Sequence, residues 1–207
     1  MKKILLVIVS FCSLNSFGQK TYTSENDVFE SKEIVFYGYD FSHFRLADVK
    51  RLYAETKKYI PAWIGFLNEH ATESTLQKTF RKEIVKFNFD YTTSLIKPLI
   101  EDSLVTVTKH SISPDSIQSI ISSYQIKENE GIGFVVIVEC FEKERKTSTA
   151  YFTFFDIASK KVIMSDYFGA NDADGYGLTN YWGVGLNATF AKYVADIYRK
   201  KLKASLK

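Results

Sequence analysis

The sequence predicts an α+β protein, in which helices cover a mixed five-stranded sheet that ends in a C-terminal antiparallel meander. Three observations support this prediction. Short runs rich in β-branched and aromatic residues are typical of strands. Other segments repeat apolar residues every three or four positions, as one face of a helix does. Two short connections between apolar runs in the last third favour hairpins. The predicted order of elements is β-α-α-β-α-β-β-β-α.

The first eighteen residues have the layout of a secretory signal peptide. Lys2 and Lys3 precede a nine-residue run that is apolar except for Ser10, and a polar stretch then leads to the small residue Gly18. Cleavage near Gly18 predicts export to the periplasm or the outer surface. A lipid anchor on Cys12 is the less favoured alternative, because the bulky Phe11 precedes it.

The rest of the chain is expected to comprise a flexible lead-in over residues 19–31 and a single α+β domain over residues 32–207. Signal cleavage leaves Cys140 as the only cysteine, so an internal disulfide is excluded, and its apolar strand predicts a buried thiol. No later segment is long and apolar enough to span a membrane. The formal net charge of +3 is too small to indicate a nucleic-acid partner.

The first half of the domain is expected to contain one strand and two helices. Residues 32–44 are rich in β-branched and aromatic residues and predict the strand. A helix is expected over residues 48–68, kinked or split at Pro61. A second helix is expected to begin with a capping box at Ser74 and to end near Pro98.

The second half is expected to contain four more strands and two more helices. A short strand is followed by a helix that starts at Ser113, where a capping residue, a proline and an acid come in succession. The nearly continuous apolar run 133–142 predicts a central strand buried on both faces. The remaining expected elements are strands at 104–109, 149–157 and 161–168 and a final helix at 179–206.

One candidate site lies at the end of the first strand, where Asp40, Ser42 and His43 are residue types that a hydrolase could use. Strand alternation places Asp40 and Ser42 on one face and His43 on the other. The sequence also lacks the Gly-x-Ser-x-Gly elbow of a hydrolase. Ordinary polar residues at a strand end are therefore the favoured interpretation.

The loop 171–177 is the most distinctive motif. Asp172 and Asp174 resemble half of a calcium loop, but this alignment places Ala170 and Tyr181 where carboxylate ligands are needed. An anion site before the following helix is disfavoured by the same two carboxylates. No other cluster suggests a metal site, and no cofactor is expected.

The favoured interpretation of this loop is a structural clasp. Gly175 and Gly177 would form a tight turn, because glycine tolerates backbone conformations that other residues resist. Asn180 would then hydrogen-bond the loop. Tyr181 and Trp182 would bury their rings and keep their polar ends satisfied.

A family resemblance rests on short motifs of the last third. Phe154-Phe155-Asp156-Ile157 and the run from Gly175-Tyr176-Gly177 to Asn180-Tyr181-Trp182 resemble a family of small exported proteins of Gram-negative bacteria that are uncharacterised. The resemblance implies export and no known activity, so it assigns no functional residue. The predicted element order is also similar to that of anticodon-binding-like domains in some outer-membrane assembly lipoproteins, which is an analogy of fold alone.

The function predicted from the sequence is a non-catalytic binding or assembly module of the cell envelope, whose partner is an envelope protein or a small ligand. One alternative is a hydrolase-type enzyme with a site assembled from distant residues, and the other is a weak calcium-binding protein. The ligand-binding candidates are Asp40, His43, Asp172 and Asp174. The enzyme alternative requires that these four side chains converge in one pocket.

Overall fold

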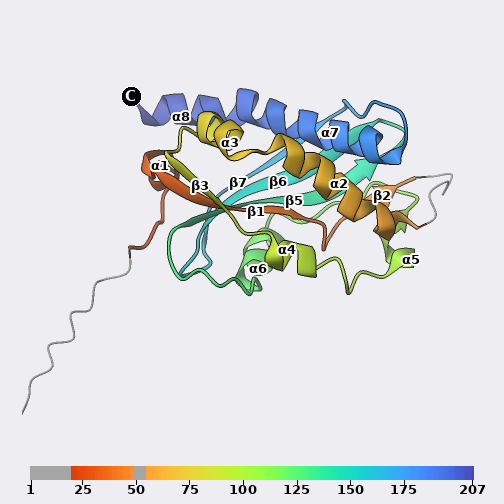
Figure 1. Ribbon diagram of the computed structural model, residues 1–207, viewed down its shortest axis with the longest axis horizontal. Coiled ribbons are helices and arrows are strands. Elements are labelled where there is room, and N and C mark those ends of the chain that lie inside the picture. The colour runs from red at the N-terminus through yellow and green to blue at the C-terminus, as the bar shows by residue number, and fades with distance from the viewer. Residues whose placement is uncertain (1–19, 49–54) are drawn as a thin grey trace, which may run out of the picture.

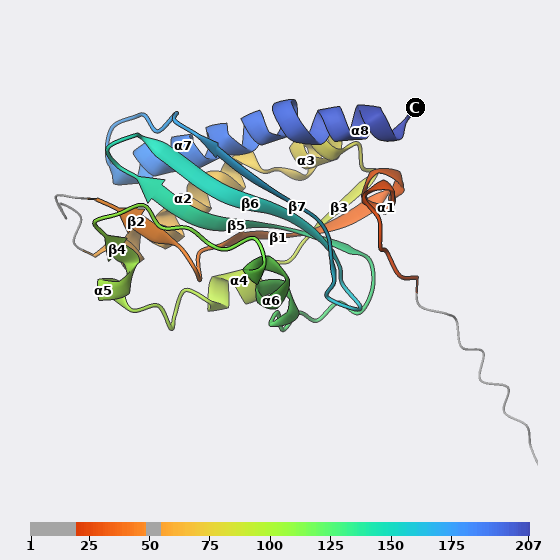
Figure 2. The same cartoon turned by 180° about the vertical axis from the view of Figure 1, so that it is seen from behind.

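The computed structural model describes residues 20–48 and 55–207, which form an α+β structure with helices on both faces of a sheet (Figures 1 and 2). The predicted signal peptide, residues 1–18, lies outside the described residues. The described residues contain seven strands, namely β1 (Glu33–Asp40), β2 (Arg45–Ala47), β3 (Ile84–Phe87), β4 (Val105–Thr106), β5 (Ile132–Glu142), β6 (Thr147–Asp156) and β7 (Val162–Ala170).

Strand β5 organises the sheet because it has partners along both edges. On one edge it pairs in parallel first with β1 and then with β2, which follow each other along its length. Strand β3 extends the sheet beyond β1, and β4 extends it beyond β2, both in parallel. On its other edge β5 pairs antiparallel with β6, and β6 pairs antiparallel with β7. The apolar run that predicted a buried strand is β5, which is buried over nearly its whole length.

The predicted arrangement of the sheet is wrong. Instead of five strands ending in a meander, the structure has a parallel set in the order β3-β1-β5-β2-β4, to which β6 and β7 are attached through β5. The physical reason is that two segments, at β2 and β3, form strands that are too short to show a periodic pattern. Parallel pairing also depends on partners distant in sequence, which local patterns do not reveal.

Helices cover the two faces of the sheet unequally (Figure 1). The long helices lie on one face, where they enclose the larger apolar core. Two short helices lie against the smaller core on the opposite face. The helices are α1 (Glu25–Glu30), α2 (Thr56–His70), α3 (Glu73–Phe80), α4 (Asp90–Ser94), α5 (Glu101–Leu104), α6 (Ser116–Ser122), α7 (Leu178–Tyr193), the π-helix η1 (Val194–Tyr198) and α8 (Arg199–Ser205).

The second predicted helix, from Ser74 to Pro98, is wrong. The N-cap of helix α3 is Thr72, two residues before the expected Ser74, and the helix ends at Phe80, followed by the C-cap Arg81, whose φ of 54° is left-handed. The next residues form β3, which pairs with β1, and α4 follows. The apolar residues of these three elements happen to recur at helical spacing, so the pattern alone suggested one continuous helix.

Three smaller expectations also change. The helix expected over residues 48–68 corresponds to α2, which begins at Thr56 and continues through Pro61. Asp48, where that helix was expected to begin, instead donates its backbone N–H to the Thr106 carbonyl beyond the end of β2. Residues 49–54 of the expected helix lie outside the described residues. The strand expected at 104–109 is only the two-residue β4.

The lead-in predicted over residues 19–31 contains an ordered helix. Ser24 and Asp27 form a reciprocal capping box at the start of α1. The Lys82 amine reaches the other end of α1 and donates to the carbonyls of Val28 and Ser31. A sequence pattern cannot show this contact, because the residues are more than fifty positions apart.

Candidate functional site

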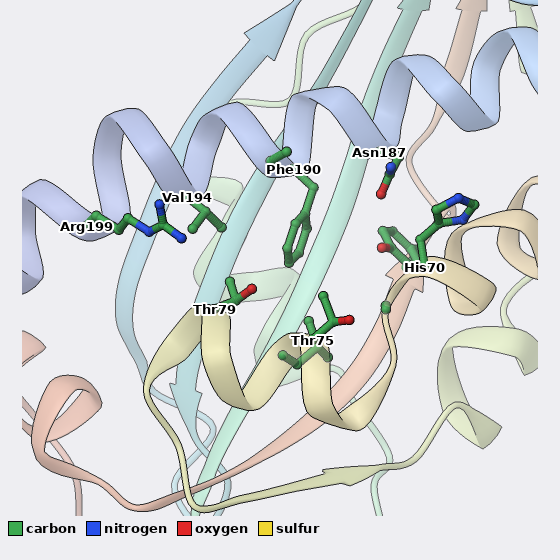
Figure 3. Close-up of a pocket in the computed structure, with 11 residues that line it drawn as sticks. His70, Thr75, Thr79, Asn187, Phe190, Val194 and Arg199 are labelled. Atoms are coloured by element: carbon green, nitrogen blue, oxygen red, sulfur yellow. The ribbon is translucent and has the colours of Figure 1, made fainter.

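The candidate site is a cavity between α3 and the C-terminal helix, which consists of α7, η1 and α8. It has a volume of about 430 Å³ and takes its lining from β1, the end of α2, α3 and the C-terminal helix. Figure 3 shows His70 and Asn187 at one end of the cavity and Arg199 at the other, with Thr75 and Thr79 facing the C-terminal helix. The cavity is thus elongated along that helix.

The floor of the cavity is apolar. Leu76 is fully buried, and Phe190 and Val194 are nearly so. These side chains belong to the main core, whereas His70, Thr75, Ala191 and Arg199 are exposed, so the cavity is a recess that opens to the surface above a core floor. Apolar surface of this kind favours an apolar ligand over water.

Tyr39 reaches this floor because of a bulge in β1. Successive strand residues alternate between faces, so Tyr37 and Tyr39 would ordinarily share one. The pairing of β1 with β5 shifts register between Phe36 and Tyr39, and Gly38 there has a φ of 79°. Tyr37 therefore packs in the smaller core and Tyr39 in the main one.

A π-helix forms part of the wall. Between α7 and α8, residues Val194–Tyr198 form a π-helical segment, and its first residue lines the cavity. Such segments are uncommon and occur frequently at functional sites, because one extra residue re-aims the side chains beyond it. The segment places the start of α8, and with it Arg199, at the cavity's end.

The polar groups around the cavity differ in whether the protein already satisfies them. The Nδ1 atom of His70 bonds the Phe66 carbonyl at 2.7 Å, and the Thr75 hydroxyl bonds that of Thr72 at 2.8 Å. In contrast, four polar groups of the lining have no hydrogen-bond or ion-pair partner among the described residues, namely the Tyr39 and Thr79 hydroxyls, the Asn187 amide and the Arg199 guanidinium. Tyr39 is only 2% exposed, whereas Arg199 is exposed.

Burial raises the pKa of Tyr39 well above the ordinary tyrosine value. The hydroxyl is therefore protonated at neutral pH and can donate a hydrogen bond. The hydroxyl is not among the fully buried side-chain atoms that lack a partner, so it is reached from the cavity, and a ligand that displaced water from it would have to accept its hydrogen bond. Tyr39 is thus the polar group most directly suited to meet a bound molecule.

Asp40, which belongs to the candidate site predicted at the end of the first strand, has a structural role. Its two carboxylate oxygens accept from the Ser42 backbone N–H at 2.7 Å and from the Tyr124 hydroxyl at 2.6 Å. The pKa of Tyr124 is raised well above its ordinary value by burial and then by the nearby Asp40 carboxylate. His43 is exposed at the turn after β1.

Asp172 and Asp174, in the predicted loop site, have partners within the fold. Asp172 forms an ion pair with Lys192 of α7 at 2.6 Å. Asp174 accepts the N–H of Gly175 at 2.8 Å, within its own turn. Across the part of the chain that the structure describes, no group of three or more His, Cys, Asp or Glu side chains could hold a metal ion.

The four predicted candidates are not brought together. Asp40 bonds Tyr124 in the smaller core, whereas Asp172 pairs with α7, which packs on the main core of the opposite face. The enzyme alternative therefore loses the convergence that it required.

The predicted clasp forms, with two differences, the first being that Tyr181, expected to bury its ring, is only partly buried. Gly175 and Gly177 both have positive φ, and Asn180 donates to the Tyr176 carbonyl at 3.2 Å. Trp182 is fully buried and stacks on Phe141 at a centroid distance of 4.6 Å. Contrary to expectation, its indole N–H has no partner within the described structure. Stacking and burial stabilise this residue without the expected hydrogen bond.

The remaining sequence-level expectations concern single residues and helices. Cys140 is buried, and burial raises the pKa of its thiol to about 11, so it behaves as an inert apolar side chain. Among the described residues, none of the helices combines the length and the apolar character needed to cross a bilayer.

Sequence reasoning missed every residue of the cavity as a site residue. Only one signal could have pointed to it, namely a glycine within a strand, which often marks a bulge next to a site. Gly38 is that residue. Comparison of the chain with protein-family models, with curated proteins and with solved structures finds no match.

Proposed function

We propose that the mature protein is a non-catalytic binding module of the cell envelope, and that it holds a small molecule in the cavity between α3 and the C-terminal helix. The observation that carries this proposal is the recess of about 430 Å³ in the main core, into which a buried, unpartnered tyrosine is built. Its volume lies within the range of about 300–1,000 Å³ that is typical of small-molecule sites.

The chemistry of the lining favours binding over catalysis. The cavity offers apolar surface, hydroxyl groups, the Asn187 amide and a guanidinium, which orient a ligand without activating a nucleophile. His70 also lines the cavity, but its ring stacks on Phe66 and its Nδ1 atom bonds the Phe66 carbonyl. These contacts fix the imidazole at the rim.

A neutral solvatochromic dye such as Nile red tests the proposal. We expect its fluorescence to rise on binding wild-type protein and to be lost in Ala191→Trp, which fills the cavity from its exposed rim. Ala195→Trp is the matched control, because Ala195 is exposed on the same helix and does not line the cavity. No response from the wild-type protein, or an undiminished response from Ala191→Trp, would contradict the proposal.

The envelope location is a separate part of the proposal and rests on the layout of residues 1–18. N-terminal sequencing of protein recovered from the periplasm of a Gram-negative host should begin near Gln19. Retention of Met1 in a cytosolic protein would overturn the location and leave the binding site unaffected.

A further inference from the structure

On the basis of the proposed function, we infer that the ligand is an elongated single-chain amphiphile. Its carboxylate pairs with Arg199, and a second oxygen at a distance along the chain accepts a hydrogen bond from Tyr39. The inference names a ligand class for the cavity and gives Tyr39 and Arg199 each a role in binding it.

Arg199 supplies the argument for an anionic end. Its side chain extends along the C-terminal helix beside Val194 (Figure 3), and no carboxylate lies within ion-pair distance of it among the described residues. A guanidinium presents a planar fork of donors that matches a carboxylate in two parallel hydrogen bonds. Because Arg199 is exposed, this pairing contributes modestly to affinity and more to selectivity.

Tyr39 supplies the argument for a second oxygen. The hydroxyl belongs to a nearly completely buried residue, lines the cavity and has no acceptor within the described structure. A purely apolar chain would displace any water there and leave the donor unpaired, at a cost to binding. A ligand hydroxyl or carbonyl oxygen meets this requirement.

The shape of the cavity supplies the argument for an elongated molecule. Asn187 and Arg199 mark its two ends and are twelve positions apart on one helix, which corresponds to about 18 Å at the usual rise per residue. Between them the floor is formed by Phe190, Val194 and Leu76. A compact anion such as phosphate would satisfy Arg199 and leave this apolar floor in water, whereas an alkyl chain covers it.

Isothermal titration calorimetry with four compounds of equal chain length tests the inference, each below its critical micelle concentration. The compounds are ω-hydroxydodecanoic acid, dodecanoic acid, dodecanol and dodecylamine. We expect affinity to fall in that order. The hydroxy acid should exceed the plain acid by about fivefold, as expected for one neutral hydrogen bond.

Two variants separate the contributions of the two ends. Arg199→Gln should weaken both acids by about fivefold and leave dodecanol unchanged, since an exposed ion pair is worth at most about 1 kcal/mol. Tyr39→Phe should weaken the hydroxy acid and leave dodecanoic acid unchanged, because only the first of these two acids carries a second oxygen along its chain. Lys200→Gln is the matched control for charge, because Lys200 is exposed, adjacent in sequence and outside the lining.

Folding does not obscure this test, because Arg199 is exposed and Tyr39→Phe removes only an unpartnered hydroxyl. Equal affinity for the acids, the alcohol and the amine would overturn the inference and leave the cavity as a general apolar site. Preference for the amine, or an acid preference that Lys200→Gln abolishes and Arg199→Gln does not, would also overturn it. Absence of binding by all four compounds and by Nile red would overturn the proposed function itself.

Discussion

Two regions of the interior differ in whether their polar side chains have hydrogen-bond partners. In the smaller core beneath α6, Asp40 is bonded by Tyr124, and the buried Glu139 accepts from the Ile112 backbone N–H and from Thr149, both at 2.8 Å. In the cavity beside α3, Tyr39 has no such partner among the described residues. Satisfied polar groups stabilise a fold, and a buried group left unsatisfied needs another explanation. The carboxylates that attract notice in the sequence therefore have partners within the fold, and the proposed site lies in a different part of the interior.

The largest expected effect tests whether the main core is tightly packed away from the cavity. Trp182→Ala should lower the free energy of unfolding by about 3–5 kcal/mol, because it removes a fully buried ring that stacks on Phe141. Chemical denaturation measures this change. Tyr176→Ala, at a residue that is 96% exposed in the same segment, should stay within about 0.5 kcal/mol of wild type. A loss below about 1 kcal/mol in Trp182→Ala would mean that the helix is loosely packed here as well.

The next effect concerns the bulge that separates the two tyrosines. Gly38→Ala should destabilise the protein by about 1–3 kcal/mol, because a non-glycine residue is strained at this positive φ. A Cβ atom would also lie 2.8 Å from the Phe89 ring. Gly65→Ala is a suitable control, since a Cβ there meets nothing within 4 Å in an exposed position of α2. Equal melting temperatures for Gly38→Ala and wild type would show that the bulge is not required.

A pair of tyrosine substitutions compares the two regions directly. Tyr124→Phe should destabilise the protein by about 1–3 kcal/mol, since it leaves a buried Asp40 oxygen without its donor. Tyr39→Phe should cost less than about 0.5 kcal/mol, because its hydroxyl has no partner to lose within the described structure. Urea denaturation of the two variants gives both values. A larger loss in Tyr39→Phe than in Tyr124→Phe would reverse the assignment of structural and binding roles.

The smallest effect concerns the acidic loop. Asp172→Asn and Asp174→Asn should each change stability by under about 1 kcal/mol, because one makes a partly exposed ion pair and the other a bond within its turn. Calcium should not raise the melting temperature of the wild-type protein. A rise of several degrees that the double variant abolishes would restore the calcium alternative.

The sequence identified most elements whose pattern is long and self-contained. The apolar run of β5 and the final amphipathic helix were recognisable because each buries a whole face or stripe. The helix expected from Ser74 to Pro98 failed because α3, β3 and α4 are too short to show their own periods. The type of an element can be predicted where the periodic pattern of its apolar residues repeats several times.

Local patterns were enough to predict an α+β core that forms without a disulfide, and a glycine-dependent clasp ahead of a long helix in the last third. Those patterns did not reveal that Tyr37 and Tyr39 face opposite cores, or that residues from α3 and the C-terminal helix enclose a cavity with Arg199 at its end. The physical reason is that burial and pairing of a polar group depend on elements brought together from distant parts of the chain, whereas local pattern specifies only which face of an element is apolar.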